Sequence, residues 1–215
     1  MTLKTLTRNS LIGLALVIIV YALFYLWLDI PLMYFIRAPF AGTFIAQLCN
    51  IIGLVASPML WFIIGVIALM YTGYQFKNKQ TCPAFTLYWG CDIVAAFILT
   101  TALKIILARY RPIELLDDNL YGFHFFSMQH DLNSTPSGHT TMAFAGLFGL
   151  ARRLKKSWLT PLLMIVAVLI ALSRIIVADH YISDVILGGY VGLTSVYWVD
   201  FILDHYCPCP RSASS

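Results

Sequence analysis

Four ionisable side chains lie where one apolar run of the sequence gives way to the next: Arg174, Asp179, His180 and Asp184. Ionisable groups at the edge of a hydrocarbon layer are costly unless they are paired or used, so such a cluster predicts a functional site. His180 and Asp184 are four residues apart, which places them on one helix face. A carboxylate that holds one imidazole nitrogen leaves the other free to attack an electrophile or take a proton. The pair therefore predicts a nucleophile or a general base.

A second set of charged residues lies at the end of an earlier apolar run, at residues 85–104. Lys104 and Arg111 are seven residues apart, or two helical turns, so we expect both side chains to point the same way. Pro112 disfavours helix at the residue before it and should end the element there. Arg109 falls on a different face, and we interpret it as an interfacial anchor that extends its charge to the membrane surface. This run therefore delivers two cations, Lys104 and Arg111, to one place.

A helix-start pattern opens a further apolar run at residues 135–139. Thr135 can cap a helix and Pro136 suits its first position. A helix N-terminus presents free N–H groups and a positive dipole end, which together bind phosphate-like anions. Gly138 lets a ligand approach the backbone closely, beside the hydroxyl of Ser137 and the imidazole of His139. This segment predicts an anion site.

These groups together have the composition of a phosphoryl-transfer site. Guanidinium forks match phosphate oxygens, and fixed positive groups stabilise the charge that builds on a transferring phosphoryl group. His180, oriented by Asp184, would attack phosphorus in line and form a phosphohistidine. His139 would protonate the departing oxygen and then activate water.

Composition indicates where this chemistry takes place. Of the 215 residues, 60% are hydrophobic and 11% are charged, against roughly 25% charged in soluble domains. We therefore predict an all-α integral membrane protein, a polytopic helix bundle that forms one domain over residues 1–215. The segment 33–50 is too polar for a span and predicts an interfacial helix before the second span. Six runs are expected to cross the bilayer, at residues 11–28, 52–74, 85–104, 139–151, 158–177 and 181–203.

The fourth run is too short to cross a core of roughly 30 Å alone, so we expect its site end below the membrane surface. Orientation follows from the basic residues. The N-terminus, the loop at 77–79, the cluster at 152–156 and the tail at 204–215 carry two, two, four and one of the 14 lysines and arginines. The positive-inside rule makes that side cytoplasmic, with both termini on it. The site then faces the non-cytoplasmic side.

The spacing of these motifs resembles the three-part signature of the type 2 phosphatidic acid phosphatase superfamily, a family of membrane lipid phosphatases and related enzymes. The three parts match in order, residue type and spacing over residues 104–184, and the one local difference is Thr135, where the family frequently has an aromatic residue. The parts are Lys104 with six residues before Arg111-Pro112, then Pro136-Ser137-Gly138-His139, then Ser173-Arg174 with five residues before His180 and three more before Asp184. The resemblance implies that the phosphate is held by Lys104, Arg111, Ser137, Gly138 and Arg174, with His139 as general acid, His180 as nucleophile and Asp184 as its partner.

A site at headgroup level best serves a phosphate ester whose other end stays in the bilayer. We expect hydrolysis of a lipid phosphate monoester or pyrophosphate on the non-cytoplasmic face of a bacterial inner (plasma) membrane. The family implies phosphatidic acid, phosphatidylglycerol phosphate, undecaprenyl pyrophosphate or lipid A 1-phosphate, and the sequence does not rank them. We expect no metal, no cofactor and no nucleic-acid partner. The sequence leaves the oligomeric state open.

Two other classes of function remain open. A lipid-to-lipid phosphotransferase would use the same phosphohistidine but pass the phosphoryl group to an acceptor other than water. A transporter or non-catalytic lipid binder would need charges that continue across the bilayer, whereas here they stop at one face apart from Asp92. For Asp92 we favour a hydrogen bond to a neighbouring span. A haloperoxidase fits least, because those members of the family are soluble.

Three further features have a plain and a functional interpretation. A metal site formed by His124, His130 and Asp131 with His139 lacks regular ligand spacing, so we disfavour it. The loop at 113–134 carries phenylalanines that would contact acyl chains or headgroups, or would pack as a lid: Phe123, Phe125 and Phe126. The tail cysteines Cys207 and Cys209 suit a metal or acylation site, but an inert tail is the simpler interpretation.

Overall fold

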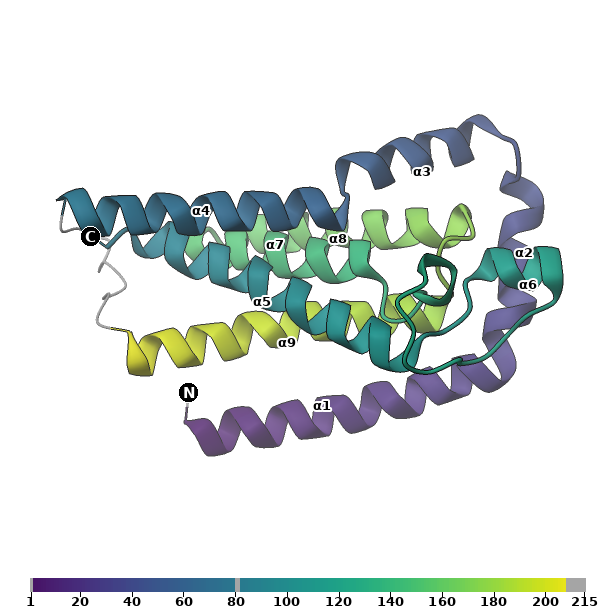
Figure 1. The fold of residues 1–215 in the computed structure, drawn as a ribbon, viewed down its shortest axis with the longest axis horizontal. Coiled ribbons are helices and arrows are strands. Elements are labelled where there is room, and N and C mark those ends of the chain that lie inside the picture. The colour runs from purple at the N-terminus through teal and green to yellow at the C-terminus, as the bar shows by residue number, and fades with distance from the viewer. Residues whose placement is uncertain (1, 80–81, 208–215) are drawn as a thin grey trace.

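The computed structural model describes residues 2–79 and 82–207, and these residues form nine α-helices (Figure 1). A π-helical turn, Phe24–Leu28, joins the first two helices, and a 3-10 helix, His130–Leu132, precedes the seventh. The helices are α1 Leu3–Leu23, α2 Asp29–Phe40, α3 Phe44–Val55, α4 Pro58–Lys79, α5 Ala84–Leu107, α6 Pro112–Asp118, α7 Gly138–Leu154, α8 Leu159–Ile176 and α9 Ile182–Tyr206. The predicted all-α class is confirmed.

Within residues 2–79 and 82–207, five helical segments are long and apolar enough to cross a membrane, so the predicted number of six spans is not confirmed. They are Leu3–Phe40, Phe44–Asn78, Ala84–Leu107, Leu159–Ile176 and Ile182–Tyr206. The remaining predicted span is α7, which has 17 residues and ends in Arg152 and Arg153. At 1.5 Å per residue such a helix is about 25 Å long, less than a hydrocarbon core of about 30 Å.

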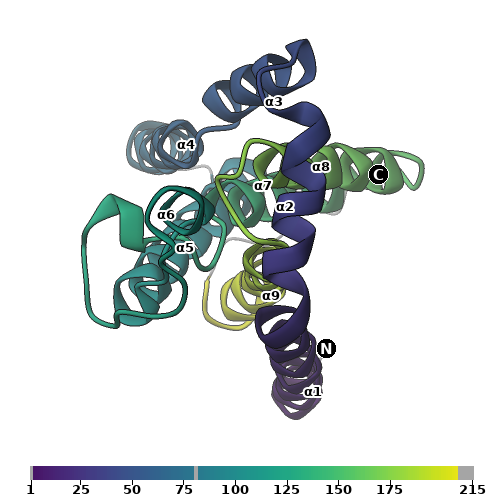
Figure 2. The same ribbon diagram turned by 90° about the vertical axis from the view of Figure 1, so that its right-hand side faces the viewer.

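The region before α4 differs from its prediction. Two helices, α2 and α3, replace the single interfacial helix expected at 33–50, and α4, which covers most of the predicted second span at 52–74, begins at Pro58. The break between them has a local cause, because Gly42 adopts a positive φ of 73° and Thr43 caps α3 by accepting a hydrogen bond from the Ala46 amide. Figure 2 shows α2 crossing the end of the bundle.

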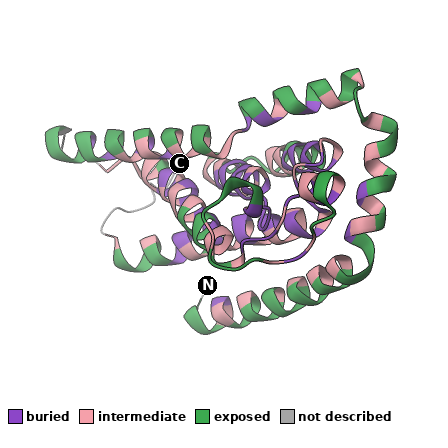
Figure 3. Ribbon diagram, turned by 45° about the vertical axis from the view of Figure 1, so that its right-hand side comes forward, coloured by how far each residue is buried: buried purple, intermediate pink, exposed green. Residues whose placement is uncertain are grey.

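The bundle is built around α7, which packs against α5, α8 and α9. Small residues let the helices approach closely, as is common between helices in membranes. A Cβ added at Gly192 of α9 would lie 2.6 Å from the carbonyl oxygen of Thr141 on α7, so a larger residue would push the two helices apart. Figure 3 shows the buried residues concentrated in this centre, whereas α1 and α4 are largely exposed. Many of their exposed side chains are apolar, including Leu16 and Ile67, as expected for a surface that faces lipid.

Four helix ends meet at one end of this bundle. α5 and α8 finish there, and α7 and α9 begin there, close to α2 and α6 (Figure 1). The described chain begins and ends at the opposite end. The topology therefore brings the three sequence motifs, which lie up to 80 residues apart, to one place.

Candidate active site

The two histidines of the motifs face each other across a short gap. His139 is the second residue of α7, and His180 lies in the turn between α8 and α9. Their ring centroids are 6.4 Å apart. A group placed between two imidazoles at this spacing can lie within about 3 Å of each, which suits one histidine as nucleophile and the other as acid or base on the same phosphorus.

Lys104 and Arg111 reach the site by a different route from the one predicted. α5 ends at Leu107, where Ala108 adopts the left-handed conformation with φ of 43°, so Arg111 lies outside the helix and does not share a helix face with Lys104. Pro112 does not end α5 but is the first residue of α6. Both cations still converge, because Lys104 donates to the carbonyl oxygen of Asn133, and Arg111 pairs with Asp179.

The start of α7 also differs in detail from its prediction. The N-cap is Ser137 rather than Thr135, and the hydroxyl of Ser137 accepts hydrogen bonds from the amide and the hydroxyl of Thr140. A Cβ added at Gly138 would lie 3.5 Å from Cε of Lys104. The lysine stem therefore runs close to the amide end of the helix, where a phosphate is favoured.

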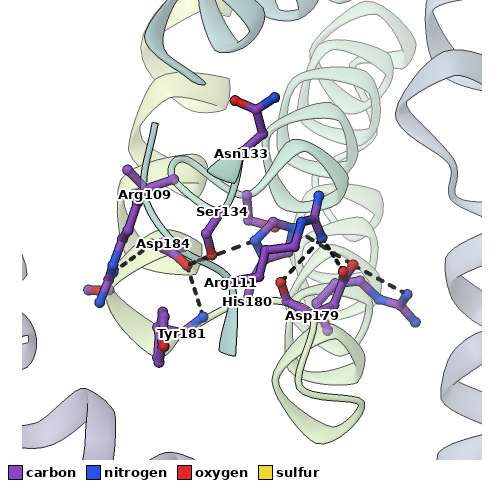
Figure 4. Close-up of polar contacts among 12 residues, drawn as sticks. Arg109, Arg111, Asn133, Ser134, Asp179, His180, Tyr181 and Asp184 are labelled. Atoms are coloured by element: carbon purple, nitrogen blue, oxygen red, sulfur yellow. Dashed lines mark hydrogen bonds and ion pairs between the residues drawn. The ribbon is translucent and has the colours of Figure 1, made fainter. Parts of the chain in front are cut away.

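Asp184 is fixed on both carboxylate oxygens (Figure 4). Its Oδ2 accepts hydrogen bonds from the Ser134 hydroxyl at 2.6 Å and the Tyr181 amide at 2.9 Å, and its Oδ1 lies 2.7 Å from Arg109. His180 Nδ1 is 3.8 Å from Oδ2 and has no hydrogen-bond partner. Asp184 is thus a rigid support held just short of hydrogen-bond distance from the imidazole.

Arg109 is wrongly predicted as an interfacial anchor. Its side chain is 0% exposed and donates to Asp29 at 2.8 Å, to Ser183 at 2.7 Å and to Asp184 at 2.7 Å. Its guanidinium also lies over the ring of Tyr181 at 4.2 Å. Burial alone would lower the pKa of Arg109, but the neighbouring carboxylates raise it well above its usual range. The arginine is therefore a permanently charged link between Asp184 and the first helical segment.

Asp29 is a second residue that sequence reasoning missed. It is buried at the start of α2, and its carboxylate accepts hydrogen bonds from the amide and the hydroxyl of Ser183 as well as from Arg109. The sequence held a signal, because an acid at the end of an apolar run is itself a functional candidate. Its partners, however, lie 80 and 154 residues further along the chain.

Asp179 completes the constellation. One carboxylate oxygen pairs with Arg111, and the other lies 3.8 Å from His139 Nδ1, 3.8 Å from His180 Nε2 and 4.0 Å from Arg174 Nη1 (Figure 4). Burial alone would raise the pKa of Asp179, but His180 and Arg111 hold it at about 2. The group is therefore an anion throughout the physiological range.

A cavity of about 600 Å³ opens in front of these groups, within the range of about 300–1,000 Å³ usual for ligand pockets. Its walls come from α3, from the 3-10 segment at 130–132 and from the turn after α8. Arg174 crosses the cavity and donates to the carbonyl oxygen of Cys49 on α3, next to Gly53. Three of the predicted phosphate-site residues line it directly, namely Arg111, His139 and Arg174.

Burial lowers the pKa of His180 below its ordinary value. The charged groups that face this imidazole have opposite effects on its pKa. Asp179 and Asp184 raise it, whereas Lys104 and Arg111 lower it. Because the burial effect is the largest, the net shift favours the neutral form of the imidazole. A neutral imidazole has the lone pair that a nucleophile needs.

The same residues include a possible set of metal ligands. Ligand atoms of His139, Asp179 and His180 lie within 4.8 Å of one another. Two imidazoles and a carboxylate suit a divalent transition metal. However, the guanidinium groups of Arg111 and Arg174 lie beside the same carboxylate, and their charge opposes a further cation. The arrangement suits an anion better. The alternative set considered from the sequence is not brought together, since His130 and Asp131 form an exposed pair at the cavity mouth.

The loop at 113–134 has two distinct parts. Phe123 packs against Tyr25, with ring centroids 5.1 Å apart, so this part is a packed cover over the Arg109 network. Residues 124–127 donate backbone hydrogen bonds to the last carbonyls of α5, whereas the side chains of Phe125 and Phe126 are exposed. The packed interpretation therefore holds for Phe123, and contact of Phe125 and Phe126 with lipid stays a prediction.

The intramembrane Asp92 belongs to a separate charge cluster at the other end of the bundle. Its Oδ2 pairs with Arg153 of α7 at 2.7 Å, so the predicted bond to a neighbouring helix is confirmed as an ion pair. Arg153 also pairs with Asp200 at 2.7 Å, and Arg152 pairs with Asp200 at 2.6 Å. Of the tail cysteines, Cys207 is a free thiol and Cys209 lies outside the described residues.

Residues 85–202, more than half of the chain, match the family model of the PAP2 superfamily. The chain is 30% identical over 141 residues to the lipid A 1-phosphatase of Rhizobium johnstonii, covering 60% of this chain and 56% of that protein. It is 29% identical over 141 residues to the lipid A 1-phosphatase of Rhizobium etli, covering 60% and 59%. A PA-phosphatase related-family protein of Dictyostelium discoideum is 25% identical over 177 residues, covering 69% and 62%. The chain thus spans less than two thirds of the length of these relatives.

Solved structures with a similar fold include two bacterial proteins. A transmembrane PAP2 type phosphatidylglycerolphosphate phosphatase from Bacillus subtilis gives a TM-score of 0.58 at 16% identity, covering 94% of this chain and 98% of that chain. LpxE of Aquifex aeolicus gives a TM-score of 0.54 at 21% identity, covering 81% and 95%. At these identities the likeness is one of fold.

Proposed function

Because this chain belongs to the PAP2 superfamily, we propose that it is an integral membrane phosphatase that hydrolyses a lipid phosphate monoester or pyrophosphate through a phosphohistidine at His180. One observation carries the proposal. Two imidazoles stand 6.4 Å apart beside the carboxylate of Asp179, which pairs with Arg111 and lies 4.0 Å from Arg174. Such fixed positive groups favour the charge that develops on a phosphoryl group in transfer.

The first chemical step forms one bond and breaks one. Nε2 of His180 attacks phosphorus and the bond from phosphorus to the lipid oxygen breaks. His139, which takes up a proton when the phosphate dianion binds beside it, gives that proton to the departing oxygen. Arg111, Arg174 and Lys104 hold the equatorial oxygens. Asp184, locked by Arg109 and Ser134, keeps Nε2 directed at the phosphorus and stabilises the imidazole as it becomes positive.

The second step returns the enzyme to its starting state. Water attacks the phosphohistidine, His139 takes the proton from that water, and the phosphorus–nitrogen bond breaks. Inorganic phosphate leaves and His180 is neutral again. The arginines and the lysine supply the positive charge throughout, so the proposed reaction needs no metal ion.

Substrate choice is best tested among lipid phosphates. The two Rhizobium relatives are lipid A 1-phosphatases and a protein of similar fold is a phosphatidylglycerolphosphate phosphatase. The site lies at the ends of the spanning helices, where a headgroup can enter while its acyl chains stay among the helices. We assign this end to the non-cytoplasmic side of a bacterial inner membrane because most basic residues lie towards the other end.

The test is release of inorganic phosphate by purified protein in detergent. The panel contains lipid A 1-phosphate, phosphatidylglycerol phosphate, phosphatidic acid and undecaprenyl pyrophosphate, each with and without a chelator. We expect release from at least one lipid, no loss of activity with chelator and no release by His180→Ala. Equal release by His180→Ala would refute the mechanism. Transfer of phosphate to a second lipid without release would identify a phosphotransferase instead.

A further inference from the structure

Asp179 stands where a substrate phosphate would have to be. Its Oδ2 is 3.8 Å from His180 Nε2, the ring nitrogen that does not face Asp184, and 3.8 Å from His139 Nδ1. Arg111 pairs with the other oxygen of the same carboxylate, and Arg174 Nη1 lies 4.0 Å from Oδ2. A carboxylate and a phosphate present the same kind of oxygen acceptor to a guanidinium. The groups that the proposed reaction uses are therefore already gathered around an anion that belongs to the protein.

Carboxylate and phosphate cannot share this place. A phosphorus atom in position for attack lies about 3–3.5 Å from the nucleophilic nitrogen. That shell around Nε2 borders the position that Oδ2 now fills. Two anions side by side would also repel each other strongly in a partly buried site. The Asp179 side chain must turn away before a phosphate can bind productively.

The surroundings of Asp179 allow such a turn. Its side chain is 26% exposed and lines the cavity of about 600 Å³, so a rotation about its own torsions leads into open space. The backbone is held, because the Asp179 amide donates to the carbonyl oxygen of Arg174 at 3.0 Å and the preceding residue, Ala178, has a left-handed φ of 59°. The side chain can therefore move without the turn that positions His180.

We propose that Asp179 is an internal competitor for the phosphate position, displaced by a lipid phosphate and restored when inorganic phosphate leaves. The inference rests on the function proposed above and concerns which anions the site accepts. A small free anion must break the Asp179–Arg111 pair with its own charge alone. A lipid phosphate also gains binding energy from its acyl chains, and this energy can offset the cost of displacing Asp179. The device would select lipid-borne phosphate over free phosphate and would speed product release.

The experiment compares inorganic phosphate binding to four proteins in detergent by isothermal titration calorimetry, with hydrolysis of the preferred lipid measured in parallel. They are the native protein, Asp179→Asn, Asp179→Ala and Asp117→Asn. Asp117→Asn is the matched control, because Asp117 is an exposed acid on α6 at the same end of the molecule and does not line the cavity. Asp179→Asn keeps the size of the side chain and an oxygen acceptor for Arg111 while it removes the charge, and Asp179→Ala removes both.

We expect both Asp179 variants to bind inorganic phosphate at least about tenfold more tightly than the native protein, because a charge-assisted pair no longer has to be broken. Product inhibition should strengthen by the same factor, and Asp117→Asn should stay within about twofold of the native value. Unchanged or weaker phosphate binding by a folded Asp179→Asn or Asp179→Ala protein would overturn the inference, and so would an equal gain in Asp117→Asn. If instead the native protein loses activity with chelator and Asp179→Asn loses a bound metal, Asp179 is a metal ligand and the inference also fails.

The two proposals fail in different ways. Tighter phosphate binding by the Asp179 variants in a protein that releases no phosphate from any lipid would support the competitor and refute the phosphatase. Release that depends on His180, with no change in phosphate affinity at Asp179, would support the phosphatase and refute the competitor.

Discussion

The two ends of the helix bundle both bury charged side chains, yet their geometry differs. At the end near the termini, Arg152 and Arg153 contact aspartates at 2.6–2.7 Å. At the site end, the imidazoles of His139 and His180 stand 3.8 Å from the nearest carboxylates, and His139 lines a cavity. Groups that complete their interactions within the protein stabilise it, whereas groups held short of contact remain available to a ligand. Buried charge alone therefore does not identify a catalytic site.

The same distinction separates two arginines within the site end. Arg109 is enclosed by Asp29, Ser183 and Asp184 and has no access to the cavity lining. Arg111 lines the cavity and has a partner, Asp179, that can move. We therefore regard Arg109 as a positioning residue and Arg111 as a phosphate-binding residue.

The largest effect should come from the nucleophile. His180→Ala should lower kcat for lipid phosphate hydrolysis by at least about a thousandfold, because the variant lacks the nitrogen that forms the covalent intermediate. Phosphate release is the measurement, with the melting temperature as a control for folding. Retention of more than a tenth of native activity in a folded variant would show that His180 is not the nucleophile. The histidine end of the bundle would then no longer be distinguished from the opposite end as the catalytic one.

A smaller loss is expected at the buried arginine. Arg109→Lys keeps the charge but cannot make the forked contacts to both aspartates, so Asp184 and His180 should shift and kcat should fall by about 10²-fold with little change in KM. The matched control is Arg153→Lys at the opposite end, whose activity should stay within about threefold of native, since it touches no reacting group. If KM rises while kcat is kept, Arg109 acts in substrate binding rather than in positioning.

The pH profile should shift modestly when Asp179 is changed. His180 must be neutral to attack, and burial lowers its pKa, so activity should rise with pH through a value below the ordinary pKa of about 6.5. It should fall again at the higher pH where His139 loses the proton that it must donate. Asp179 raises the pKa of His180. In Asp179→Asn the rise of activity on the acid side of the profile, here called the acid limb, should therefore move to lower pH. The other facing charges, Asp184, Lys104 and Arg111, are unchanged in that variant. A shift of the limb to higher pH, measured from kcat/KM, would contradict the assignment.

The smallest effect on turnover should come from the opposite end. Arg153→Ala leaves Asp92 buried without its partner and should lower stability by about 3 kcal/mol. The folded fraction should nevertheless hydrolyse lipid phosphate within about twofold of the native rate. Thermal unfolding in detergent and activity per folded molecule test the two halves of this prediction. A tenfold loss of activity in the folded fraction would show that the two ends are coupled.

The sequence predicted the parts of the site that depend on residue type and spacing. Lys104, Arg111, Ser137, Gly138, His139, Arg174, His180 and Asp184 meet at one end of the bundle because each lies at or near the end of an apolar run. The helix limits were less predictable. α5 ends at Leu107 because Ala108 adopts the left-handed conformation, and no proline or glycine at that position indicates a helix end. The short length of α7 could be predicted from the sequence, but its position at the centre of the bundle could not.

The partners of the buried charges could not be predicted. Arg109 and Asp29 are 80 residues apart, and nothing in either local sequence specifies the other. Asp179 was visible as a neighbour of His180, but only the folded turn shows that its carboxylate faces the attacking nitrogen. Long-range pairing of side chains depends on how helices pack, which a single sequence does not reveal.

The most direct test of the proposed mechanism is detection of the covalent intermediate. The protein is mixed with its preferred lipid phosphate carrying a ³²P label, the reaction is quenched in alkali within milliseconds, and labelled peptides are identified by mass spectrometry. The mechanism predicts an alkali-stable phosphate on the peptide that contains His180, with more of it in His139→Gln because hydrolysis of the intermediate is slowed. Turnover of the lipid with no label on His180 in either protein would contradict it.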